Sequence, residues 1–262
     1  MIHAVQKTEP TEDCGAYDIL GWVYYFDVMA RFSYRHWRTE HVRAIVDALG
    51  SDSNGSGSCR IQSLLARGSF ARRVPNISVH AHPVVRLLAE VADTALYSTD
   101  PRYLSIEYQQ HLDELRSSLE NVSPRSKPSP DGLDSTERPL ELTRLAGLIH
   151  LERISRNFSG QSAVIESWTT QALSIIAQLD SCLCPFALFI VGCETDKDAD
   201  RMIILDLYAR METRPYLKSF MEGRALIQTA WNMQDLAEDG ELEYIQKLNI
   251  VMSSRDVVPS LI

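Results

Sequence analysis

Apolar residues recur at every third or fourth position through most of this sequence, which is the spacing of amphipathic α-helices. No segment shows the strict alternation of apolar and polar residues that is typical of a half-buried strand, and no internal repeat is visible. The pattern therefore predicts an all-α fold. Helices are expected at residues 19–38, 40–49, 83–96, 101–119, 142–151, 168–179, 186–191, 199–211, 216–235 and 241–252.

The starts of two of these helices are predicted from capping residues. Asp100 followed by Pro101 is expected to begin one helix, because aspartate accepts backbone N–H groups at a helix start and proline fits the first turn. Thr195, with Asp198 three residues later, is expected to cap the helix that begins at residue 199.

Three stretches lack helical periodicity and are predicted to be flexible. Residues 1–16 are polar and are expected to form a flexible arm. Residues 51–58 (SDSNGSGS) have the composition of a linker, and residues 123–138 contain three prolines and several serines. The parts of the chain on either side of residues 51–58 and 123–138 do not contain a complete core by themselves. These two stretches are therefore interpreted as flexible loops within a single helical domain of residues 17–262.

Charge limits the classes of partner. The net charge of −9 argues against a general nucleic-acid binder, because backbone phosphates require a basic surface. Residues 31–73 carry a local excess of +5, but they contain no recognisable element for reading DNA, so direct DNA binding is not expected. Residues 194–243 carry −6. Both runs are interpreted as solvated helix faces or partner-docking surfaces, and homodimerisation through the acidic C-terminal helices is one hypothesis.

Cysteine usage indicates reduced thiols. The chain has five cysteines, an odd number, with no CxxC pair and no signal peptide, which favours the nucleus or cytoplasm. We expect these thiols to be buried as small apolar side chains. His80 and His82 have no carboxylate cluster beside them, so neither a metal site nor a cofactor is predicted. No apolar run approaches the roughly 18 residues needed to cross a membrane.

The most informative segment is PFALFIVGCE, residues 185–194, followed by Arg201, Trp231 and Asp235. It resembles the C-terminal part of the fungal-specific transcription factor domain, the helical regulatory region that usually follows a Zn2Cys6 DNA-binding cluster. Residues 22–38, 87–96 and 141–154 are weakly similar to earlier helices of that family. The five cysteines are one too few for the cluster itself.

The resemblance implies an irregular multi-helix bundle of the fungal regulatory-domain type. It further implies a transcription-regulator-like protein that acts without its own zinc cluster. Such a protein would work through a partner from the transcription machinery, a related regulator or a small molecule, in control of a metabolic gene cluster.

The same segment has a physical interpretation of its own. Residues 186–191 are apolar on all sides, which predicts a centrally buried helix, and Gly192 indicates a close helix crossing or a turn. Glu194 is expected to pair with Arg201 or to cap the next helix. Trp231 and Asp235 are four residues apart and share one helical face, as a core tryptophan with a helix-end aspartate or as the wall of a pocket.

Some members of the family bind small apolar molecules, including sterols, between their helices. The resemblance therefore implies an apolar pocket, although the same residue types at helical spacing also form ordinary cores. The candidate lining residues are Trp22, Phe26, Met29, Phe186, Phe189, Met202, Met221 and Trp231.

No catalytic motif is present: the sequence contains no GxSxG, no glycine-rich phosphate loop, no HExxH and no dinucleotide fingerprint. No catalytic residue is therefore predicted. The alternative hypothesis is a biosynthetic enzyme, a cyclase or isomerase, that uses an apolar pocket with one or two acids or bases. Its acid–base candidates would be His36, His150, Glu152, Glu194 and Asp235.

Overall fold

The computed structural model describes residues 14–37, 83–122, 137–157, 159–182, 184–212, 218–236, 243–259 and 261, with backbone alone for 14–23, 218 and 219. Its helices are α1 (Cys14–His36), α4 (Pro83–Thr94), α5 (Ile106–Asn121), α6 (Glu137–Arg156), α7 (Ala163–Ala177), α8 (Pro185–Cys193), α9 (Asp198–Met211), α10 (Lys218–Leu236) and α11 (Tyr244–Ser253). No strand occurs in these ranges, so the predicted all-α class is confirmed.

Several sequence predictions fall partly or wholly outside this description. The helix expected at residues 40–49 and the loop at 51–58 lie outside it, as do His80 and His82. The same holds for residues 1–13 of the predicted arm and for 123–136 of the second predicted loop. Helix α1 begins at Cys14, within the last residues of that arm.

Helix α8 lies at the centre of the molecule, as its sequence predicts. It starts with Pro185 at the first turn, where the missing N–H costs nothing, and every residue through Cys193 is buried. Its neighbours are α6, α7, α9 and α10. Burial of each large side chain, such as Phe186 or Phe189, contributes about 1.5–3 kcal/mol. A helix that is apolar on all sides is stable only when other helices surround it.

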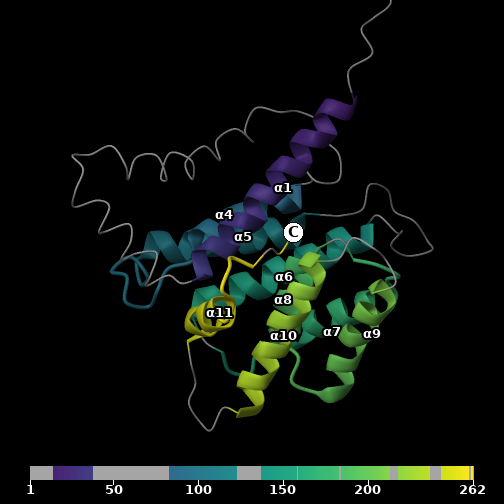
Figure 1. Ribbon diagram of the computed structural model, residues 1–262. Coiled ribbons are helices and arrows are strands. Elements are labelled where there is room, and N and C mark those ends of the chain that lie inside the picture. Colours follow the sequence, from purple (N-terminus) through teal and green to yellow (C-terminus); the bar gives the residue numbers. More distant parts are fainter. Residues whose placement is uncertain are drawn as a thin grey trace, which may run out of the picture.

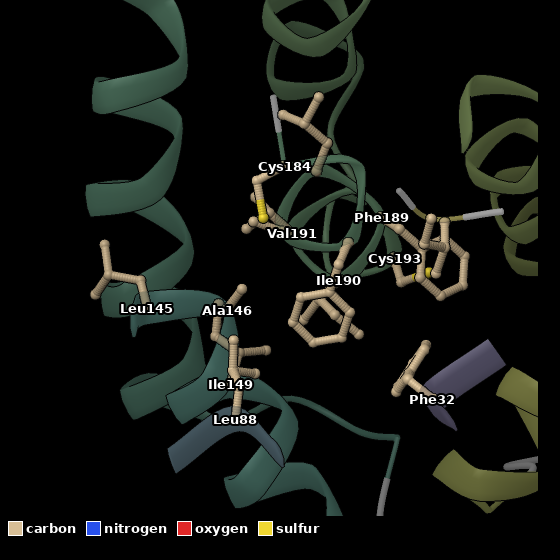
Figure 2. Packing of buried hydrophobic residues seen from close by; sticks show 14 of the residues in the cluster. Phe32, Leu88, Leu145, Ala146, Ile149, Cys184, Phe189, Ile190, Val191 and Cys193 are labelled. Carbon is tan, nitrogen blue, oxygen red and sulfur yellow. The ribbon is translucent and has the colours of Figure 1, made fainter. Parts of the chain in front are cut away.

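Most of the remaining helices form two groups on either side of α6 and α8 (Figure 1). Helices α1, α4, α5 and α11 lie on one side and α7 and α9 on the other, whereas α10 packs along α8 and also contacts α11. Helix α6 contacts both groups, because it packs on α4, α5, α7, α8 and α11. Figure 2 shows side chains of α1, α4, α6 and α8, including Phe32, Leu88 and Ile149, gathered in one apolar cluster.

The capping residues predicted for two helices are wrong. Helix α5 begins at Ile106, where the Ser105 Oγ accepts the Tyr108 N–H at 3.2 Å; Asp100 instead accepts hydrogen bonds from Arg102 in the preceding turn. Helix α9 begins at Asp198 without a side-chain cap. The Thr195 hydroxyl donates to the Gly192 carbonyl oxygen at 2.8 Å, so it closes the end of α8 and does not cap α9.

Helix α6 ends at an unusual backbone conformation. Asn157 has a φ of 43°, a left-handed value that asparagine adopts more readily than most residues. Its N–H donates to the Ile154 carbonyl at 3.2 Å, and its Oδ1 accepts the Ile245 N–H at 3.3 Å. This turn therefore connects the end of α6 to α11, just before the connection of residues 159–162 that leads to α7.

The described cysteine side chains fit the expectation of buried thiols. Cys182, Cys184 and Cys193 are buried, and none of them forms a disulfide. The Cys184 Sγ accepts hydrogen bonds from the hydroxyls of Tyr25 and Thr143, each at 3.3 Å. None of the described helices is both long and apolar enough to span a bilayer.

Candidate functional site

A polar cavity of about 430 Å³ lies where the end of α6, the connection to α7 and parts of α7 to α11 meet. Its volume is in the range of small-molecule binding sites. Cys193 and Glu194, the last two residues of the PFALFIVGCE segment, contribute to its wall. The cavity is lined by Arg153, Ser159, Gly160, Gln161, Ser162, Ile165, Glu166, Thr169, Thr170, Leu173, Cys193, Glu194, Asp196, Lys197, Asp200, Gln234 and Lys247.

A buried ion pair forms one side of this cavity. The Arg153 guanidinium donates from Nη2 to Glu194 Oε2 at 2.5 Å and from Nε to both carboxylate oxygens at 3.1 and 3.2 Å. Its Nη1 donates to the Gly160 carbonyl at 2.6 Å. The two side chains are only 8% and 7% exposed. The pair therefore fixes the end of α8 against α6 and the 159–162 connection.

This arrangement corrects the sequence prediction for Glu194. Glu194 is the C-cap residue of α8, and its carboxylate faces α6, so it pairs with Arg153 and neither pairs with Arg201 nor caps α9. Nothing in the sequence spacing indicated this pair, because its partners lie 41 positions apart on different helices.

Three residues that line the cavity each contain a buried polar atom that has no hydrogen-bond partner among the described residues. They are the Ser159 Oγ, the Thr169 Oγ1 and the Gln234 Oε1. Thr169 as a whole is 7% exposed. Gln234 uses its Nε2 to donate to the Cys193 carbonyl at 2.8 Å, which leaves its Oε1 as an acceptor. These three atoms are fully buried, so they lie behind the cavity surface and a molecule in the cavity would not reach them.

Two helix starts also border the cavity. Neither Ser162, the N-cap of α7, nor Lys197, the N-cap of α9, provides a side-chain hydrogen bond to its helix. The first backbone N–H groups of an α-helix have no intrahelical acceptor, and the helix dipole adds a partial positive charge there. Acidic side chains balance this charge, since Glu166 lies on the first turn of α7 and Asp200 on that of α9.

Cys193 and Lys247 are neighbours in the lining of the cavity. Lys247 Nζ lies 3.5 Å from the Cys193 carbonyl oxygen. Burial raises the pKa of the Cys193 thiol to about 12, although the Lys247 charge opposes this effect. Because the thiolate is the reactive form, Cys193 is expected to be chemically inert at neutral pH.

The residues of the resemblance that follow the PFALFIVGCE segment, Arg201, Trp231 and Asp235, hold α8 against α10. The Trp231 indole N–H lies 2.8 Å from the Gly192 carbonyl oxygen and 2.9 Å from the Thr195 hydroxyl. The Arg201 guanidinium lies 5.4 Å from the centre of the Trp231 ring and makes two hydrogen bonds to Asp235, at 2.8 and 2.9 Å. Trp231 and Asp235 thus share one helical face, as their spacing indicates.

Gly192 lies at the closest approach of these two helices. A Cβ atom at this position would lie 2.9 Å from the Cγ1 and Cγ2 atoms of Ile227 on α10. Only glycine fits there without movement, so the predicted close helix crossing is present.

The residues proposed for an apolar pocket occupy different environments. Met29, Phe186, Phe189 and Trp231 are buried in the core, whereas the side chain of Trp22 lies outside the described part. None of the described members of this set lines the polar cavity, so the apolar pocket stays a prediction. The members that are more than a third exposed are Phe26, Met202 and Met221.

Two of the acid–base candidates lie together in the core. The rings of His36 and His150 are 6.2 Å apart between centres. The Nδ1 of His36 is 2.8 Å from Asn249 Oδ1, and the Nδ1 of His150 is 2.8 Å from the Tyr244 hydroxyl. Burial lowers the pKa of His36 to about 4 and that of His150 well below its usual value. Both rings are therefore neutral at neutral pH.

The other candidates are engaged in ion pairs. Glu152 pairs with Arg116 at 2.9 Å and with Arg156 at 3.0 Å, and Asp235 pairs with Arg201. Among the candidates, Glu194 alone lines the cavity. Within the described residues, no three His, Cys, Asp or Glu side chains converge as a metal site would require.

Comparisons with known proteins agree with the resemblance carried by the signature. The model of a family described as the fungal-specific transcription factor domain matches residues 16–250. The transcription factor iacI of Pestalotiopsis fici is 27% identical over 241 residues, a match that covers 92% of this chain. The chain spans 58% of the length of that curated relative. No solved structure matches.

Proposed function

Because the chain belongs to the fungal-specific transcription factor domain family, we propose that it is a regulator of transcription. The observation that carries this proposal is the extent of the family match, which runs from α1 into α11 and includes both the α8–α10 crossing and the cavity. The relative from Pestalotiopsis fici, whose name describes a transcription factor, supports the same role.

The regulator is proposed to act in the nucleus through a protein partner, either a component of the transcription machinery or a related regulator. The acidic character of the chain supports a protein partner over direct contact with DNA, because a net charge of −9 repels backbone phosphates. Its targets are proposed to form a metabolic gene cluster, and a cavity of metabolite size supports a regulator that responds to a small molecule.

Gene deletion tests this function most directly. Transcripts and metabolites are compared between the deletion strain, the parent strain and a strain in which the wild-type gene is restored. We expect the transcripts of a defined gene set to change on deletion and to return on restoration.

A second assay tests the domain itself. The 262-residue chain is fused to an unrelated DNA-binding domain, and a reporter with the matching operator is measured. A change in reporter output relative to the DNA-binding domain alone supports regulation through a partner. Unchanged transcripts and reporter, together with one accumulating intermediate, would overturn the proposal in favour of a biosynthetic cyclase or isomerase.

A further inference from the structure

Helix α10 exposes one uncharged face to solvent. The helix packs on α8 and α11 with its other side, and in Figure 1 it lies in front of the remaining helices. The exposed face consists of residues that follow one another at intervals of three or four positions, the spacing of one helix side: Met221, Ala225, Gln228, Asn232 and Leu236. Leu236 is 80% and Met221 is 46% exposed. Because a solvated helix face normally carries charges, an uncharged face about 22 Å long indicates a contact surface.

Two charges of opposite sign border this face along one edge. Arg224 lies near the start of the face and Asp235 near its end, and residues eleven positions apart lie on the same side of an α-helix. Within the chain, Arg224 pairs with Glu212, and Asp235 pairs with Arg201. The side chain of Arg224 is 30% exposed and that of Asp235 is 56% exposed, so each is also accessible to a second molecule.

We propose that the chain forms a homodimer in which α10 pairs antiparallel with α10 of a second copy. A two-fold axis beside Gln228 places Met221 of each copy opposite Leu236 of the other, so the exposed apolar side chains cover each other. At the axis the two Gln228 side chains face each other, and an amide both donates and accepts hydrogen bonds. Ala225 lies opposite Asn232 of the second copy, and its small side chain allows the two helices to approach closely.

The border charges select the second copy and its orientation. In the antiparallel pairing, Arg224 of one copy lies within about 3 Å, measured along the helix axis, of Asp235 of the other. The charges then alternate in sign from Glu212 and Arg224 of one copy to Asp235 and Arg201 of the other, and such a network contributes more than isolated surface pairs. A parallel pairing would instead bring Arg224 against Arg224 and Asp235 against Asp235. The face is therefore complementary to itself only when the helices run in opposite directions.

This contact gives the homodimer hypothesis a defined surface. The centre of the contact is the uncharged face of α10, and the acidic residues of 194–243 contribute only at its border. One helix face per copy is small for a protein–protein interface, so we expect a dissociation constant in the micromolar range. The dimer does not depend on the regulatory function proposed above, because the purified chain alone is sufficient to form it.

Sedimentation velocity of the purified 262-residue chain tests the proposal. Samples from about 1 µM to about 200 µM cover the range of a micromolar dimer. We expect the measured mass to rise with concentration from that of one chain toward that of two. Gln228→Glu, which keeps the shape of the side chain, places two carboxylates across the axis and should raise the dissociation constant at least about tenfold. The matched control is Gln110→Glu at an exposed position of α5, which adds the same charge outside α10 and should leave the constant unchanged.

A mixing experiment tests the antiparallel orientation. Arg224→Glu and Asp235→Arg each create two like-charge contacts in their own homodimer, so each variant alone should sediment as a monomer. In an equimolar mixture, the new glutamate of one variant faces the new arginine of the other, while the second contact keeps its natural residues. The mixture should therefore dimerise at concentrations where neither variant does. Because mixing does not alter either folded chain, this recovery separates a direct contact from a loss of stability, and circular dichroism establishes that each variant is folded.

Three results would overturn the proposed dimer. A chain that stays monomeric at every concentration would leave the α10 face to a partner of different sequence. A dimer that persists unchanged with Gln228→Glu would use another surface. A mixture of Arg224→Glu and Asp235→Arg that stays monomeric, although each variant is folded, would exclude the antiparallel pairing.

Discussion

Replacement of Gly192 by alanine is the most direct test of how the family signature supports the fold. The added Cβ would lie 2.9 Å from the Cγ1 and Cγ2 atoms of Ile227 and 3.0 Å from its Cδ1. Two of these atoms are attached directly to the branched Cβ of Ile227, which restricts χ1 rotation and prevents an easy escape. Accommodation of the methyl group therefore requires α8 and α10 to separate at their crossing.

Overpacking of a core by one methyl group costs about 1–3 kcal/mol. Alanine is favoured over glycine in a helix interior by about 1 kcal/mol, but Gly192 is the second-last residue of α8, so this gain is only partly realised. The net expectation is a loss of about 1–2 kcal/mol of unfolding free energy. For a domain of this size that loss lowers the melting temperature by roughly 2–8 °C.

Gly147 on α6 provides a matched control. It is also a buried helix glycine, but its added Cβ would meet Leu88 Cδ2 at 3.5 Å, an ordinary van der Waals distance. Gly147→Ala should therefore raise the free energy of unfolding by up to about 1 kcal/mol. Urea denaturation, followed by far-UV circular dichroism, measures both variants.

A double-mutant cycle isolates the contact itself. Ile227→Ala removes the three side-chain atoms that the new methyl would strike. In that background Gly192→Ala should no longer destabilise the protein. The coupling energy between Gly192→Ala and Ile227→Ala should therefore be at least about 1 kcal/mol. Equal effects of Gly192→Ala and Gly147→Ala, or a coupling energy near zero, would refute the reasoning.

Further predictions concern other buried groups, and urea denaturation checks each. Arg153→Met strands the Glu194 carboxylate, so the free energy of unfolding should fall by about 3–5 kcal/mol. Arg201→Met should cost less, because its partner Asp235 is more than half exposed to water. Folded His36 stays neutral down to a pKa of about 4, but the unfolded imidazole binds a proton near 6.5. Stability should therefore fall by about 1.3 kcal/mol from this group between about pH 7.5 and 5.5, and His36→Gln should show a smaller pH dependence. Ser105→Ala removes the α5 cap and should cost about 0.5–2 kcal/mol; no change would contradict the capping role.

The helices themselves could be predicted because their signals are local. Helix α4 begins at Pro83 as the pattern indicates, and α8 is buried because every residue from Pro185 to Cys193 is apolar or small. The starts of α5 and α9 could not be predicted from capping residues, since several candidates lie within a few positions and tertiary contacts select among them. Thr195 is the clear case: its hydroxyl is engaged by Gly192 and Trp231.

Sequence alone thus determined the all-α class, the central position of α8 and the family. Each of these depends on residue type, on helical spacing or on a contiguous motif. Tertiary structure decided that Glu194 pairs with Arg153, that His36 adjoins His150, and that a polar cavity exists. The cavity combines residues from six helices, separated by up to 94 positions between Arg153 and Lys247. Periodicity fixes which face of a helix is buried, but not which side chains of other helices it meets.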